Sequence, residues 1–127
     1  MSMTLIIAGG GTGGHVFPGI ALAEAFQEAV PGGSVSFVGT ESGLEADLVP
    51  ARGYPLRFVP KVPLPRRPSG EWVALPGKLK SAVEAAGAVI DETRAEVVVG
   101  FGGYVSPPAY LAAHRRAGGQ RRQRRSD

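Results

Sequence analysis

The sequence contains no cysteine, which excludes a disulfide framework and any thiolate metal site. It also lacks a long hydrophobic run, because the apolar start of the chain ends at Gly9. That stretch is too short for a signal peptide or for a membrane span, so we expect a cytoplasmic protein. No Ser/His/Asp group, carboxylate pair or cluster of metal ligands stands out, which argues against covalent catalysis and metal-assisted hydrolysis.

Positive charge is concentrated at the C-terminus. Residues 1–114 carry 8 Lys and Arg against 10 Asp and Glu, a net charge of −2, whereas residues 115–127 carry 6 Arg and 1 Asp, a net charge of +5. Residues 118–127 contain no apolar side chain, so we predict a disordered basic tail. Such a tail can attract nucleic acid or anionic lipid. Residues 1–114 give no such signal, and we expect no nucleic acid partner.

Short apolar segments alternate with segments of helical periodicity. Expected strands cover residues 4–8, 34–38, 56–59 and 97–100, and expected helices cover 17–30, 44–52, 72–94 and 109–116. The third helix is expected to start properly only after Pro76-Gly77. This alternation predicts one α/β domain, a Rossmann-like open parallel sheet with helices on both faces.

A glycine-rich segment, Gly9 to His15 (GGGTGGH), follows the first strand and opens the first helix. Glycines let a ligand approach the main chain closely, and the N-terminus of a helix favours an anion. The segment therefore indicates a phosphate or diphosphate site. His15 titrates near neutral pH, and at this position it suits a general base that removes a proton from an attacking hydroxyl.

Two other interpretations of this segment are weaker. Gly9, Gly11 and Gly14 fit the G-x-G-x-x-G pattern of dinucleotide-binding folds. That pattern requires an acidic residue at the end of the second strand, but Val38 is followed by glycine and threonine. The glycines would also serve a simple tight turn.

A second glycine-rich segment, residues 100–107 (GFGGYVSP), lies between another strand and another helix. Both segments would lie at the carboxyl ends of parallel strands, where such sheets bind ligands. We expect them to hold two phosphates of one ligand or two phosphorylated ligands. A helix start capped by Ser106, with Pro107 at the first position, explains the same residues and does not exclude anion binding.

Residues 61–80 mix basic and apolar side chains. They favour contact with an anionic membrane surface. An ordinary loop followed by a helix with a core-facing side accounts for them equally well. The patch consists of Lys61, Arg66, Arg67, Trp72, Leu75, Lys78 and Leu79.

Three motifs together carry a family resemblance: residues 9–18 (GGGTGGHVFP), 39–45 (GTESGLE) and 100–107. From about Thr4 to Gly118, the chain resembles glycosyltransferase family 28, in particular the transferases of peptidoglycan synthesis. These enzymes add N-acetylglucosamine from UDP-N-acetylglucosamine to the undecaprenyl-diphosphate-linked muramyl pentapeptide. The resemblance implies the N-terminal, acceptor-side half of a two-domain GT-B fold. It also implies inverting transfer without a metal or other cofactor, and a peripheral location on the inner face of the cell membrane.

The resemblance implies a role for each matching residue. His15 would be the base for the acceptor hydroxyl, Thr12, Gly13 and Gly14 would meet the donor or its diphosphate, and the basic and apolar patch would contact the membrane. The acceptor diphosphate would be held by Gly102, Gly103 and Tyr104.

The chain departs from the family after Ala117-Gly118. There the family continues with an apolar strand and a His-Glu-Gln-Asn motif, whereas this chain has Gly119-Gln120-Arg121-Arg122. We therefore expect an incomplete acceptor-side domain over residues 1–117 and a tail over 118–127. We expect no transfer by these residues alone, since the donor would not be held in line. The alternatives are a non-catalytic module that binds a membrane or a polyprenyl diphosphate and, less well supported, a dinucleotide-binding oxidoreductase fragment.

Overall fold

The computed structural model describes residues 3–9, 13–60, 68, 70–101 and 106–126. Strands and helices alternate along these ranges, as the sequence predicts. The elements are β1 (Thr4–Ala8), α1 (Gly13–Ala29), β2 (Ser34–Gly39), α2 (Glu45–Ala51), β3 (Leu56–Phe58), α3 (Glu71–Thr93), β4 (Val97–Gly100) and α4 (Ser106–Ser126).

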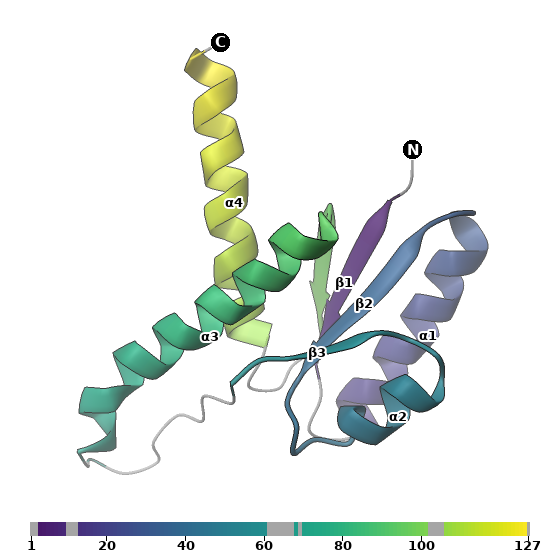
Figure 1. The fold of residues 1–127 in the computed structure, drawn as a ribbon, viewed down its shortest axis with the longest axis horizontal. Coiled ribbons are helices and arrows are strands. Elements are labelled where there is room, and N and C mark those ends of the chain that lie inside the picture. The colour runs from purple at the N-terminus through teal and green to yellow at the C-terminus, as the bar shows by residue number, and fades with distance from the viewer. Residues whose placement is uncertain (1–2, 10–12, 61–67, 69, 102–105, 127) are drawn as a thin grey trace.

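The four strands form one parallel sheet in the order β3-β2-β1-β4 (Figure 1). In this sheet β1 is central, because Leu5 pairs with Val35 of β2 on one side and with Val97 of β4 on the other. The predicted Rossmann-like parallel sheet is therefore confirmed. Val97, the first residue of β4, is 37% exposed because this strand lies at the edge of the sheet.

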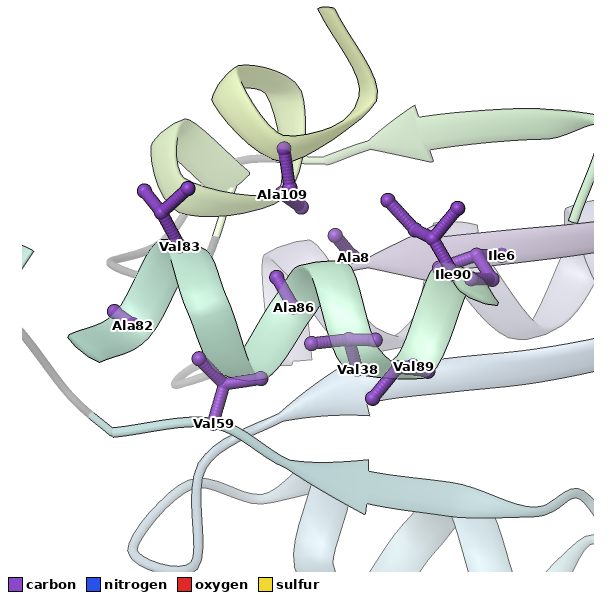
Figure 2. Close-up of a cluster of buried hydrophobic side chains, with 11 residues drawn as sticks. Ile6, Ala8, Val38, Val59, Ala82, Val83, Ala86, Val89, Ile90 and Ala109 are labelled. Carbon is purple, nitrogen blue, oxygen red and sulfur yellow. The ribbon is translucent and has the colours of Figure 1, made fainter. Parts of the chain in front are cut away.

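Each face of the sheet carries two helices (Figure 1). Side chains of a strand alternate between the two faces, so β1 contributes to both hydrophobic clusters. Leu5 and Ile7 pack in one cluster with residues of α1 and α2. Ile6 and Ala8 pack in the other cluster with α3 and α4 (Figure 2).

Two helices begin earlier than the sequence suggests. α1 starts at Gly13, inside the glycine-rich segment, rather than at Phe17. α3 starts at Glu71 and contains Pro76, so the expected start after Pro76-Gly77 is wrong. A proline costs one main-chain hydrogen bond in a helix. Helix α3 nonetheless continues through Pro76 because Leu75 and Leu79 on either side of it pack against the core.

The C-terminal segment also differs from expectation, because α4 runs to Ser126 through the residues predicted to be disordered. Arginine and glutamine are good helix formers, and no proline follows Pro108. In Figure 1 the end of α4 extends away from the sheet. The structure therefore gives this segment a helical backbone where the sequence predicts disorder.

Candidate functional site

The chain order of the strands reverses between β1 and β4. From β1 the sheet continues through β2 to β3 on one side, and β4 is added on the opposite side. Ligands of open parallel sheets bind outside the carboxyl ends of the strands at such a switch point. Ala8 and Gly100, the last residues of β1 and β4, are paired there, and the Phe101 N–H donates to the Ala8 carbonyl oxygen at 2.9 Å.

The first glycine-rich segment leaves the sheet at this point. Gly9 is buried, and its N–H donates to the Val38 carbonyl oxygen of β2 at 3.3 Å. The chain re-enters the described region at Gly13, already in α1, so Gly13, Gly14 and His15 form the first turn of that helix. The first N–H groups of a helix have no partner within it and favour an anion. Thr12 and the side chain of His15 lie outside the described part of the structure.

Close packing of α1 on the sheet fixes the direction of this turn. A Cβ atom built on Gly19 would lie 3.1 Å from Cγ2 of Ile7 in β1 and 3.4 Å from Cε1 of Phe37 in β2. A larger residue would therefore push α1 away from the strands. Gly19 thus lets α1 pack closely against β1 and β2.

The second glycine-rich segment starts on the neighbouring strand. Gly102, Gly103 and Tyr104 lie outside the described residues, but both ends of the segment are defined. Gly100 ends β4, and α4 begins at Ser106. The hydroxyl of Tyr110 on α4 donates to the Gly100 carbonyl oxygen at 3.1 Å. Both glycine-rich segments therefore start from adjacent, paired strand ends, as the sequence predicts for two segments at one edge.

A buried carboxylate organises the motif of residues 39–45 (GTESGLE), and the sequence analysis did not predict this feature. Glu45 is 1% exposed, and its Oε1 accepts the Thr40 N–H at 2.8 Å and the Thr40 hydroxyl at 3.2 Å. A Cβ atom at either Gly39 or Gly43 would overlap the Glu45 side chain. The available signal was the pair of glycines that precede Glu45 in GTESGLE, since they make room for its side chain.

The structure divides the predicted membrane patch. Trp72 is 46% exposed and Val73 is 86% exposed at the start of α3, and Lys78 is also exposed. Leu75 and Leu79 instead pack against the hydrophobic core. Residues 61–67, which include Lys61, Arg66 and Arg67, lie outside the described residues. Among the helices that the structure describes, none has the length and apolar character needed to cross a membrane.

Comparison with known proteins gives one family. The sequence profile of the glycosyltransferase family 28 N-terminal domain matches residues 5–120. Two relatives carry the name UDP-N-acetylglucosamine--N-acetylmuramyl-(pentapeptide) pyrophosphoryl-undecaprenol N-acetylglucosamine transferase. The protein from Streptomyces avermitilis is 50% identical over 113 residues, which cover 89% of this chain and 31% of the relative. The protein from Saccharopolyspora erythraea is 54% identical over 110 residues, which cover 87% of this chain and 29% of the relative.

The fold has a counterpart among solved structures. The crystal structure of Acinetobacter baumannii MurG superposes with a TM-score of 0.72 at 33% sequence identity, covering 88% of this chain and 32% of that one. The chain thus spans about 30% of the length of the relatives that it matches.

Proposed function

This chain belongs to glycosyltransferase family 28, and from that membership we propose that it is the acceptor-side part of an N-acetylglucosaminyltransferase. The complete enzyme would move N-acetylglucosamine from UDP-N-acetylglucosamine to an undecaprenyl-diphosphate-linked muramyl pentapeptide. The observation that carries this proposal is the pairing of Ala8 with Gly100, which starts both glycine-rich segments from one point of the sheet edge. A diphosphate can be held from two sides at such a point.

We assign the roles as follows. The N–H groups of Gly13 and Gly14 at the start of α1 bind diphosphate oxygens together with Thr12. The acceptor diphosphate is held by Gly102, Gly103 and Tyr104. His15, in the same first turn, accepts the proton of the acceptor hydroxyl as that oxygen bonds to the anomeric carbon of the donor and UDP departs. The proton moves to His15 and the carbon inverts.

We also propose that the start of α3 brings the protein to the cytoplasmic surface of the membrane. Trp72 and Val73 are exposed there, and the exposed Lys78 and Lys80 follow on the same helix. A helix that combines exposed apolar and cationic side chains suits an anionic lipid interface. Peripheral attachment would place the glycine-rich segments near a diphosphate that projects from the bilayer.

A chimaera tests the catalytic proposal. Residues 1–117 would replace the matching part of the Streptomyces avermitilis relative, and transfer of labelled N-acetylglucosamine to a lipid-linked acceptor would be measured. We expect transfer by the chimaera and its loss in the His15→Ala version, while the 127-residue chain alone gives none. A folded chimaera without activity, together with acceptor binding by the chain alone, would favour the non-catalytic binding module instead.

A further inference from the structure

A hollow lies at the carboxyl ends of β2 and β3, on the same edge of the sheet from which the glycine-rich segments start. It has a volume of about 540 Å³, within the usual range of small-ligand pockets. Its walls come from the segment after β2 and from the end of β3. The lining residues are Thr40, Glu41, Ser42, Phe58, Val59 and Pro60.

From this hollow we infer a sugar-binding subsite, which takes the N-acetylmuramyl ring of the acceptor, joined to the diphosphate held by the glycine-rich segments. The inference rests on the proposed function, because it places the rest of the same ligand. It goes further in assigning that part of the ligand to a pocket outside both glycine-rich segments.

The position of the hollow fits a ligand that continues from the diphosphate. The Gly9 N–H bonds to Val38 of β2, so the first glycine-rich segment starts against the strand that leads to Thr40. Adjacent strands lie about 4.8 Å apart. The step from the end of β1 to the space between β2 and β3 is therefore about 5–10 Å, the reach of one pyranose ring beyond a phosphate.

The chemistry of the lining fits a sugar rather than a phosphate. Among the described lining residues, the charged side chain is the carboxylate of Glu41, which repels an anion and accepts hydrogen bonds from sugar hydroxyls. The hydroxyl of Ser42 donates or accepts. Phe58, 48% exposed at the end of β3, offers an aromatic ring to the apolar side of a pyranose. Val59 and Pro60 supply apolar contact for an N-acetyl methyl group.

The buried Glu45 holds one wall of this hollow in place. Thr40 is 8% exposed, and both its N–H and its hydroxyl donate to Glu45. The Thr40 hydroxyl hydrogen is used in that bond, so its oxygen presents only acceptor capacity to a ligand. A wall fixed before binding lowers the entropic cost of binding. Glu45 is therefore a positioning residue for the subsite.

Calorimetry on the 127-residue chain tests the subsite with three probes: inorganic pyrophosphate, a soluble N-acetylmuramyl 1-diphosphate and UDP-N-acetylglucosamine. We expect the muramyl diphosphate to bind about tenfold more tightly than pyrophosphate, the scale of one aromatic contact with its hydrogen bonds. Phe58→Ala and Glu41→Gln should remove most of this difference and leave pyrophosphate binding unchanged. A tighter response to UDP-N-acetylglucosamine than to the muramyl ligand would assign the subsite to the donor sugar and overturn its assignment to the acceptor.

Matched variants keep the test specific. Glu28→Gln changes an exposed carboxylate on α1, and Leu44→Ala truncates a side chain that is 47% exposed and does not line the hollow. Both should bind all probes normally. Ser42→Ala provides a mild variant at an exposed position should Phe58→Ala fold poorly. Equal binding of pyrophosphate and muramyl diphosphate would overturn the subsite alone, whereas absence of all binding would overturn the proposed function as well.

Discussion

Arg116 on α4 binds Asp91 on α3 through two charge-assisted hydrogen bonds, Nε to Oδ1 and a terminal nitrogen to Oδ2, each 2.7 Å long. The guanidinium also donates to the Ala112 carbonyl oxygen at 3.2 Å. It lies over Gly87, where a Cβ atom would come within 2.6 Å of it. The pair therefore joins the two helices that cover one face of the sheet.

The Asp91–Arg116 pair predicts a pH-dependent contribution to stability. Hydrogen bonding to Arg116 holds the pKa of Asp91 below its usual value. The unfolded chain thus takes up this proton first, so the contribution is complete above the unfolded pKa of about 3.9 and is lost as pH falls through the lower folded pKa. Asp91→Asn should lower Tm at neutral pH, and its difference from the parent should shrink below about pH 4.

The control for this titration is Glu84→Gln. Glu84 forms an exposed pair with Lys80 at 4.0 Å, a geometry that contributes little. Its Tm difference from the parent should be small at every pH. A difference for Asp91→Asn that persists unchanged to pH 2.5 would contradict the assignment.

Substitution by alanine should change the free energy of unfolding differently at two glycines of α3. Gly77 has open space around its Cβ position, so Gly77→Ala should raise the free energy of unfolding by roughly 0.5–1 kcal/mol through helix propensity. Gly87→Ala gains the same propensity but displaces the Arg116 guanidinium. Urea denaturation should show Gly87→Ala as the less stable of the two. Equal stabilisation would mean that Arg116 adjusts without losing Asp91.

The effects of substitutions at Glu45 and at Gly43 on the free energy of unfolding should be coupled. Glu45→Ala leaves the Thr40 donors without this acceptor, at a cost of roughly 1–3 kcal/mol of unfolding free energy. Gly43→Ala should also destabilise the protein, because the new methyl group overlaps the glutamate. In the Glu45→Ala background, Gly43→Ala should cost less. Gly77→Ala should instead combine additively with Glu45→Ala, and additivity in both cases would refute the steric explanation.

Binding to anionic vesicles tests the start of α3. Trp72→Ala and Val73→Ala should weaken binding to vesicles that contain phosphatidylglycerol, because each removes exposed apolar surface. Added salt should weaken the binding of the parent through screening of the basic residues. Leu111→Ala, which truncates a side chain 43% exposed on α4, is the matched control. Co-sedimentation that is equal for all variants would place the membrane contact elsewhere.

The fold could be predicted from the sequence because its signals are local. Four short apolar runs separated by helical segments predicted the approximate bounds of each strand that the structure describes. The motif residues could be placed at the sheet edge because the carboxyl ends of parallel strands share an edge. Helix starts were less accurate, since proline and glycine near the first turns of α1 and α3 argue against a helix that packing then stabilises.

Contacts between distant segments could not be predicted in the same way. Nothing in the local pattern shows that Phe58 and Ser42 border one hollow, because that depends on the pairing of β3 with β2. The burial of Glu45 could not be predicted either, since a glutamate next to a helix start is normally exposed to solvent. The division of the membrane patch also needed the structure, because the core-facing side of α3 includes Leu75 and Leu79.

The central place of β1 also sets an order for assembly. Its partner on one side, β2, follows closely in the chain, but Leu5 meets Val97 of β4 only after most of the sequence has been made. Chains leave the ribosome N-terminus first, and contacts between remote segments carry the larger loop-closure cost. A nascent chain that has reached only α3 therefore has its first glycine-rich segment but not β4, the neighbouring strand from which the second one starts. Under the proposed function, a chain stalled before Gly100 would not bind the diphosphate, so ligand binding would report that β4 has joined β1.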